Sequence, residues 1–271
     1  MARMLIWGAV PVLDSNRLLT WFQAEQRQMP WRETRDPYGI WISEVMLQQT
    51  QVDTVRDYWI RFMERFPTAQ ALAAAPLDAV LKAWEGLGYY SRARNLHEAA
   101  QLIADRHGGK LPADPAQLRA LPGFGPYTAG AVAAIAFNLP EPAVDGNVLR
   151  VLARVLDCGD DITQPAARRR FEEVAREAIP AGRASEFVQA LMELGALICT
   201  PRKPRCGACP VAGDCQARRA GTAEGLPRKA RRGQAPYADV IVAVCVDGDR
   251  VVVARRPEKG LLGGLMAFPL V

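Results

Sequence analysis

Apolar residues recur at helical spacing through the first two hundred residues of the chain. Residues 51–66 show the pattern best, because their apolar side chains fall on one stripe of a helix. This stripe consists of Val52, Val55, Trp59, Phe62 and Phe66. No segment before residue 236 alternates between apolar and polar residues as a half-buried strand does. The pattern therefore predicts an all-α region.

Proline and glycine residues divide this region into helices of ordinary length. Residues 14–28 read as one amphipathic helix. Further helices are predicted to begin at Thr68, Ser91, Asp114, Thr128, Asn147, Thr163 and Ala184. Several of these residues carry a side-chain oxygen that can accept a hydrogen bond from the first turn of a helix. We expect the helical region to occupy residues 1–220.

The pattern changes near residue 236. Residues 221–236 are basic and rich in small residues, which predicts a linker. After them, the apolar stretches 240–246 and 251–254 flank Asp247 and Gly248, a pair typical of a tight hairpin turn. Residues 237–271 are therefore predicted to form a short β segment. With two or three strands, this segment cannot bury a sheet well on its own.

Composition limits the class of protein further. The chain has 271 residues, 49% of them hydrophobic, so it can bury one large core or two smaller ones. The apolar run at residues 4–13 is interrupted by Pro11 and is too short for a membrane span, so we expect neither a signal peptide nor a membrane segment. Four of the six cysteines crowd into residues 199–215, which indicates metal ligation in a reducing cytoplasm.

Positive charge is concentrated late in the chain. The formal net charge is +5, yet residues 201–233 alone hold nine Lys and Arg against two Asp and Glu, so the remainder is close to neutral. A basic stretch on a nearly neutral body suggests a surface that meets phosphate groups. A solvated run of charges explains the same pattern equally well. Charge alone therefore does not identify the partner.

The crowded cysteines follow the spacing C-x6-C-x2-C-x5-C. They are Cys199, Cys206, Cys209 and Cys215. This spacing lets four thiolates converge on one centre. Structural zinc is the alternative, although zinc sites usually place two close cysteine pairs on separate knuckles. Here the first cysteine ends a predicted helix and the other three share one tight loop, which differs from that zinc arrangement but leaves both metal centres open.

A glycine- and proline-rich turn joins two predicted helices at residues 121–128. Gly123 and Gly125 allow backbone turns with positive φ angles, and the helix after them begins with free amides. Those amides, with that of Thr128, can bind a DNA phosphate without a basic side chain. The alternative is a plain turn between helices. Asp145, about twenty residues later, caps the next predicted helix, whose dipole should keep the carboxylate ionised.

Glu44 stands in an apolar neighbourhood, between Ser43 and Val45 in the stretch 41–47. A glutamate on the surface would not need such neighbours. Burial would raise the pKa of its carboxyl and keep it protonated near neutral pH, as a general acid requires. An exposed helix position is the alternative. The burial of Glu44 is thus the sharpest structural expectation.

These motifs together resemble the MutY-type adenine DNA glycosylases of the endonuclease III superfamily. The resemblance is carried by the stretches 41–51, 86–94, 121–128 and 144–147 and by the four cysteines. It implies a two-lobed, all-α, helix-hairpin-helix glycosylase fold, with the hairpin at about 114–138 and a 4Fe–4S loop at 199–215. It also implies that residues 237–271 begin a Nudix-like domain that the chain carries only in truncated form.

The resemblance implies roles for individual residues. Glu44 would protonate the adenine, and Asp145 would stabilise the sugar cation, assisted by Tyr127 and Asn147. Gln49 and Tyr89 would wedge into the gap that the flipped adenine leaves. Arg32 and Glu193 would lie near the adenine. The implied substrate is duplex DNA with adenine opposite 8-oxoguanine or guanine, bound by a monomer associated with the nucleoid of a bacterial-type cell.

Two other functions remain open. Endonuclease III-like glycosylase/lyases carry a lysine nucleophile where this chain has Tyr127, so strand cleavage is disfavoured. These relatives also read Asp-Thr-His where the chain has Asp145, Gly146 and Asn147. A noncatalytic iron–sulfur protein that only binds DNA would need neither Glu44 nor Asp145. We therefore expect a monofunctional hydrolase.

Overall fold

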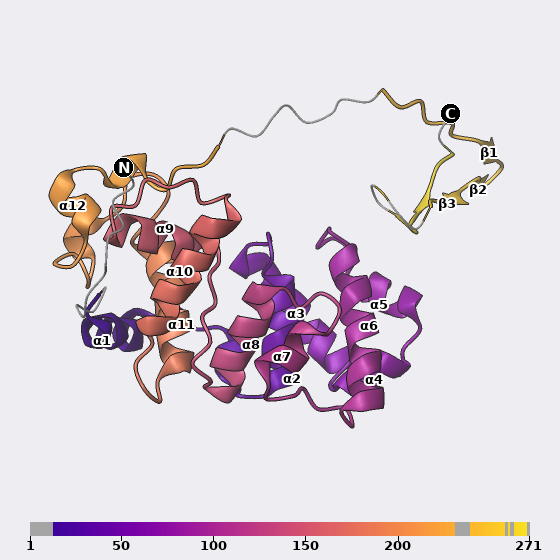
Figure 1. Cartoon of the computed structure of the whole chain (residues 1–271). Helices are drawn as coiled ribbons and strands as arrows, with labels where there is room; N and C mark the ends of the chain where they lie inside the picture. The colour runs from indigo at the N-terminus through magenta and orange to yellow at the C-terminus, as the bar shows by residue number, and fades with distance from the viewer. Residues whose placement is uncertain (1–12, 231–238, 258–259, 261–262, 270–271) are drawn as a thin grey trace.

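The computed structural model of this chain describes residues 13–230, 239–257, 260 and 263–269. Within them the chain is mostly helical, which confirms the predicted all-α region (Figure 1). The α-helices are α1 (Ser15–Glu25), α2 (Pro37–Met46), α3 (Val52–Arg65), α4 (Ala69–Ala74), α5 (Leu77–Ala83), α6 (Ser91–Arg106), α7 (Pro115–Arg119), α8 (Pro126–Phe137), α9 (Gly146–Val155), α10 (Pro165–Glu177), α11 (Ala184–Leu197) and α12 (Gln216–Ala220). Among the described helices, none combines the length and apolar character that a bilayer crossing requires.

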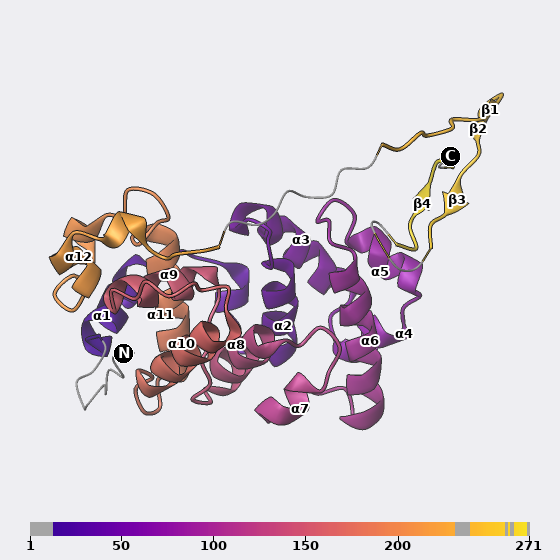
Figure 2. The ribbon, with the colours of Figure 1, turned by 45° about the horizontal axis from the view of Figure 1, so that its top comes forward.

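Within the described part of the chain, the two largest hydrophobic cores divide the helices into two lobes, as predicted. The core of the first lobe is built from α2 to α8 and includes Trp41, Phe62 and Trp84. The core of the second lobe joins α1 near the N-terminus to α9, α10 and α11, which lie more than a hundred residues later. Helix α8 packs against both α2 and α11 and so connects the lobes (Figures 1 and 2).

Helix α2 lies at the centre of the first lobe. Asp36 begins it, because its carboxylate accepts hydrogen bonds from the amides of Tyr38 and Gly39 at 3.2 and 3.1 Å. Pro37 stands at the first helical position, where its missing N–H costs nothing. Every residue from Tyr38 to Met46 is buried, since α3, α6 and α8 pack around the helix. A polar side chain on α2 is therefore removed from bulk water.

The predicted helix-hairpin-helix is present as α7, a short turn, and α8. Gly123 adopts a φ angle of 76°, which favours glycine. Gly125 instead has a φ angle of −70°, so the expectation that it needs a positive φ is wrong. Gly125 caps α8 without a side-chain acceptor, and Pro126 occupies the first helical position. The turn therefore presents the start of α8 to the exterior.

Among the described residues of the predicted β segment there are four short strands, more than the two or three expected: β1 (Val246–Asp247), β2 (Arg250–Val251), β3 (Ala254–Arg255) and β4 (Met266–Ala267). The first two form the predicted antiparallel hairpin, and β3 pairs antiparallel with β4. Most of their apolar side chains are exposed, Val246 to 65%. This confirms that the β segment does not bury a sheet by itself. Its likeness to a Nudix-like domain stays a prediction.

Residues 221–228, at the start of the expected linker, pack on the second lobe. Leu226 is buried, and its carbonyl accepts a hydrogen bond from Arg154 of α9 at 3.0 Å. The carbonyl of Arg228 accepts one from the amide of Ile162 at 3.1 Å. Residues 231–236 of the expected linker lie outside the described residues, and so does the apolar run at 4–12. The domain boundaries stay a prediction.

Candidate active site

A cavity of about 240 Å³ lies where the two lobes meet. It brings together all six residues that the sequence predicts for chemistry or substrate contact: Glu44, Tyr127, Asp145, Asn147, Arg32 and Glu193. Glu44 comes from α2 and Tyr127 from α8, while the others come from segments of the second lobe or from the short helix η1 (Pro30–Arg32). The cavity thus holds two groups of polar side chains from opposite sides.

Glu44 is buried, with 6% of its surface exposed, so the predicted burial is confirmed. Loss of water around the carboxyl raises its pKa to about 7. The hydroxyl of Tyr127 donates a hydrogen bond to Glu44 Oε2 at 2.6 Å and opposes this rise, whereas the charge of Asp145 adds to it. Glu44 can therefore keep its proton near neutral pH and donate it to a bound group.

Asp145 caps α9 and faces the same cavity. Its Oδ1 accepts a hydrogen bond from the amide of Val148 at 2.7 Å, and its Oδ2 accepts one from the side chain of Asn147 at 2.8 Å. The helix cap alone predicts a lowered pKa. Instead, burial raises the pKa of Asp145 above its ordinary value, against the effect of these hydrogen bonds. Asn147 thus serves the site by orienting the carboxyl of Asp145.

Glu193 on α11 forms the opposite wall of the cavity. Its carboxylate accepts hydrogen bonds from Arg27 at 2.8 Å and from Arg32 at 3.0 Å, and the Arg27 amide donates another at 2.9 Å. Burial alone would raise the pKa of Glu193, but the two arginines outweigh it and lower the pKa to about 2. Sequence reasoning missed Arg27, because its partner lies 166 residues away and no local pattern marks it.

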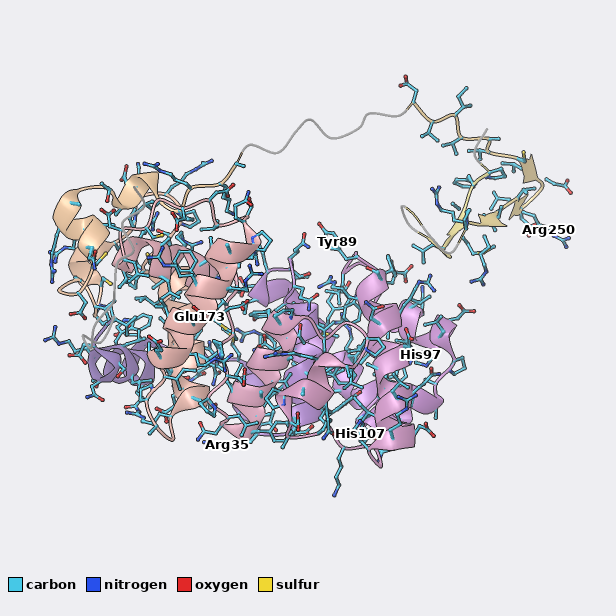
Figure 3. The ribbon with its side chains drawn as sticks, in the orientation of Figure 1. Arg35, Tyr89, His97, His107, Glu173 and Arg250 are labelled. Carbon is cyan, nitrogen blue, oxygen red and sulfur yellow. The ribbon has the colours of Figure 1, made fainter. Side chains whose placement is uncertain are left out.

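Three of the predicted DNA-binding residues meet at a second cavity, of about 250 Å³, on the first lobe. Gln49, Tyr89 and Gly123 line it. Gln49 and Tyr89 both have left-handed backbones, with φ angles of 59° and 46°. Tyr89 is 57% exposed, and Figure 3 shows it at the upper edge of the first lobe. Both side chains therefore sit on turns that project from the lobe.

Thr128 is placed differently from Gly123 and Gly125, which are exposed. Its side chain is buried, and its hydroxyl accepts a hydrogen bond from Gln48 at 3.2 Å. A phosphate at the start of α8 would meet backbone amides there, not the Thr128 hydroxyl. The hydrogen bond also joins the turn that carries Gln49 to the hairpin helix.

The four cysteines line one cavity beside the second lobe, together with apolar side chains of α9 and α11. Among the described residues, no three His, Cys, Asp or Glu side chains converge closely enough to bind a single ion. Four thiols around one apolar cavity fit the iron–sulfur cluster that the resemblance of the cysteine spacing implies. Buried Arg154 donates hydrogen bonds to Cys199 Sγ at 3.3 Å and to the Thr200 carbonyl at 2.7 Å, which fixes the start of the loop.

A second buried arginine, Arg150, lies between the cysteine loop and the active-site cavity. It donates hydrogen bonds to the carbonyl of Cys199 at 2.7 Å and to Asn147 Oδ1 at 2.9 Å. Asn147 in turn holds Asp145. The sequence gives no sign of either arginine's role, because each is simply a charged residue within α9.

Two segments of the chain match known protein families. Residues 42–177 match the HhH-GPD superfamily of base excision DNA repair proteins. Residues 199–215 match the iron–sulfur binding domain of endonuclease III, which confirms the predicted 4Fe–4S cluster. The four cysteines lie within this matched segment. The first match includes Glu44, Tyr127, Asp145 and Asn147, and the second covers the whole cysteine loop. Arg32 and Glu193 lie outside both matched ranges.

Curated relatives are adenine DNA glycosylases. The Mycobacterium tuberculosis protein is 44% identical over 233 residues, which cover 85% of this chain and 75% of that protein. The Rattus norvegicus protein is 39% identical over 308 residues, covering 94% of this chain and 59% of that protein. The chain thus spans between about half and three fifths of the length of the first curated relatives. These matches confirm the resemblance predicted from the motifs.

Solved structures share the fold. A thermostable thymine-DNA glycosylase superposes with a TM-score of 0.69 at 29% identity, covering 76% of this chain and 95% of its own. A trapped endonuclease III–DNA covalent intermediate superposes with a TM-score of 0.65 at 26% identity, covering 76% of this chain and 94% of its own. The two-lobed arrangement is therefore a known glycosylase scaffold.

Proposed function

The chain belongs to the HhH-GPD superfamily of base excision DNA repair proteins, and on that premise we propose that it is an adenine DNA glycosylase. It would hydrolyse the bond between adenine and deoxyribose in mispaired duplex DNA. The observation that carries the proposal is the cavity that Glu44 and Asp145 both line, where burial raises the pKa of Glu44 to about 7. A carboxylic acid and a carboxylate in one cavity are the two groups that cleavage of a glycosidic bond requires.

We assign each step of the hydrolysis to a residue of the cavity. Glu44 gives its proton to N7 of the flipped adenine, which makes the base a better leaving group. As the bond to the sugar breaks, positive charge develops at C1′ and the carboxylate of Asp145 stabilises it. Water then adds to C1′ and gives its proton to the Glu44 carboxylate, which restores the acid. Tyr127 and Asn147 hold the two carboxyl groups in place through the hydrogen bonds described above.

Arg32 and Glu193 would contact the adenine, with Arg27 as their partner. The pair of arginines keeps Glu193 ionised, so its oxygens can only accept hydrogen bonds. The Glu193 carboxylate already accepts four hydrogen bonds from Arg27 and Arg32, so it would hold these arginines beside the base and would not itself bind an amino group of the base. The two arginines of this ion pair would thus recognise the base, while Glu44 and Asp145 act on the bond between the base and the sugar.

DNA would be held by three surfaces. Phosphates would meet the amides at the start of α8, beyond Gly123 and Gly125. Exposed Arg202, Lys203 and Arg205 of the cysteine loop would meet further phosphates. Gln49 and Tyr89 would enter the gap that the flipped adenine leaves in the base stack. The 4Fe–4S cluster, bound by the four cysteines, would supply the fixed shape of this loop.

The absence of a primary amine at residue 127 argues for a monofunctional enzyme. Tyr127 is half-buried and its hydroxyl donates a hydrogen bond to Glu44, and loss of water around the phenol raises its pKa well above its ordinary value. It is therefore not a nucleophile for a Schiff base, which needs an amine. We propose that the enzyme acts as a monomer on adenine opposite 8-oxoguanine or guanine, on DNA in the cytoplasm of a bacterial-type cell.

One assay separates this function from the two alternatives. Duplexes carrying adenine opposite 8-oxoguanine, adenine opposite guanine, or thymine glycol are incubated with the protein, and strand breaks are scored with and without alkali. We expect breaks at adenine only after alkali. Breaks at thymine glycol without alkali would instead indicate a glycosylase/lyase, and binding without breaks would indicate a noncatalytic DNA-binding protein.

A further inference from the structure

Arg92 is a buried charged residue of α6 that the proposed mechanism does not use. Its side chain is 8% exposed, and its guanidinium lies 5.3 Å from the ring centre of Trp84 and 5.5 Å from that of Tyr89. Buried arginines are rare unless their donors are satisfied. The partners of this guanidinium therefore indicate its role.

Its two terminal nitrogens bind two turns that are distant in sequence. One nitrogen donates to the carbonyls of Val45, Met46 and Gln48 at 3.0, 2.9 and 2.6 Å. The other donates to the carbonyls of Leu87 and Gly88 at 3.1 and 3.3 Å. The first set ends α2 and begins the turn of Gln49, whereas the second set precedes Tyr89. A single side chain thus holds both turns at a fixed separation.

Both turns carry strain at the residue that projects from them. Gln49 and Tyr89 are not glycines, yet both adopt the left-handed backbone region. This conformation costs free energy and persists only where neighbouring contacts impose it. The second nitrogen of Arg92 also donates to the Thr50 hydroxyl at 3.2 Å, so the guanidinium holds the chain on both sides of Gln49. Gln48 adds the contact to Thr128 on α8.

We propose that Arg92 is a positioning residue that clamps the turns of Gln49 and Tyr89 so that the two side chains enter the base stack together. This inference rests on the proposed function, because it assigns Arg92 a part in opening the DNA. Lysine cannot replace it, since an ammonium group lacks the planar fork that reaches both turns. Arg92 acts only through Gln49 and Tyr89.

A double-mutant cycle tests the clamp. Single-turnover adenine release is measured for the parent, Arg92→Lys, the double variant Gln49→Ala/Tyr89→Ala, and the triple variant. We expect Arg92→Lys to slow release on the order of 100-fold in the parent, but less than about 3-fold where both wedge side chains are already missing. Arg106→Lys, an exposed position in the last turn of the same helix, is the control and should change neither rate.

A second readout does not depend on catalysis. 2-Aminopurine placed beside the mispaired adenine fluoresces more when the stack opens, and we expect this rise with the parent but not with Arg92→Lys. Equal slowing by Arg92→Lys in both backgrounds, an intact fluorescence rise, or loss of the folded state would overturn the clamp. If the parent releases no adenine at all, the proposed function fails, and the fluorescence comparison still decides the role of Arg92.

Discussion

Two buried glutamates in one cavity have opposite pKa shifts, because their neighbours differ. Glu44 is buried among apolar residues with one phenol beside it, and the pKa of its carboxyl rises to about 7. Glu193 is just as buried, but two guanidinium groups bind it, and its pKa falls to about 2. At neutral pH the first can donate a proton and the second can only accept hydrogen bonds.

The pKa of Glu44 predicts the pH dependence of adenine release. Because the general acid must be protonated, the single-turnover rate should fall about tenfold per pH unit once the pH exceeds about 7. Glu44→Gln should retain binding to an adenine mispair and lose about 10³-fold or more in rate. The rate is measured from pH 5 to pH 9 in both proteins.

Unfolding provides the control for this variant. The folded-state pKa of Glu44 lies above its unfolded value, so its contribution to stability is present at low pH and is lost as the pH rises through about 7. Glu44→Gln should therefore be more stable than the parent at pH 9. Near-normal turnover by a folded Glu44→Gln protein would remove Glu44 from the mechanism.

Glu193 predicts the opposite dependence of stability on pH. Glu193→Gln leaves Arg27 and Arg32 without their carboxylate, which should lower the free energy of unfolding by about 2–4 kcal/mol at pH 7. The value is set below that of a fully buried pair because Arg27 is 37% exposed. Since the pKa is depressed, the difference should be constant down to about pH 5 and shrink as the pH falls toward 2. Denaturant unfolding of both proteins between pH 7 and pH 3 measures it, and a constant difference throughout would exclude the ion pair as its source.

At the scale of elements, the sequence predicts helices well where a cap and a stripe coincide. Thr68 and Asp114 are the caps of α4 and α7, and each accepts a hydrogen bond from the first turn. The helix predicted from Thr68 nevertheless ends at Ala74, and α5 begins separately after Pro76. Helix α2 has no apolar stripe because it is buried on all sides, so periodicity does not reveal it. The elements packed around a helix therefore decide whether its sequence pattern reveals it.

The contact between α9 and α11 depends on Gly195. A Cβ atom at residue 195 would lie 2.6 Å from Asn147 Cβ and 3.1 Å from the Asn147 backbone, so the two helices would have to separate. Gly195→Ala should lower the free energy of unfolding by about 1–3 kcal/mol and also slow adenine release, since Asn147 orients Asp145. Thermal unfolding and single-turnover kinetics measure the two effects.

Gly225→Ala is the matched control, because nothing lies within 4 Å of a Cβ atom at that residue. It should leave both measurements unchanged. A Gly195→Ala protein with the parent's stability and rate would mean that the helices can separate without moving Asn147.

For the molecule as a whole, the site exists only because the lobes meet. Glu44 and Tyr127 are 83 residues apart, and Arg27 and Glu193 are 166 residues apart. The resemblance of short motifs predicts most of these residues, since each motif is recognisable locally. It does not predict Arg27, Arg92 or Arg150, because a buried arginine is defined by carbonyls and carboxylates that fold against it. The pKa direction of Asp145 is missed for the same reason: burial depends on the other lobe.

The two separate cores predict how the protein responds to loss of its cluster. Cys206→Ser removes one proposed ligand from a loop that packs on the second lobe through Val211 and Arg154. The core of the first lobe, with α2 and α8, has no contact with this loop among its buried residues. We therefore expect Cys206→Ser to lose iron and labile sulfide while most of the helical content remains.

The affinity of Cys206→Ser for DNA should fall more than about tenfold, and the salt dependence of binding should weaken by about one to three phosphate contacts, because the exposed cations at 202–205 are no longer held in place. Metal and sulfide analysis, circular dichroism and binding at several salt concentrations measure these effects. Cys245→Ser, an exposed cysteine outside the cavity, is the control and should match the parent. Stoichiometric zinc without sulfide in anaerobically prepared parent would overturn the cluster assignment. Unchanged DNA affinity in cluster-free Cys206→Ser would show that the loop binds phosphate without the cluster.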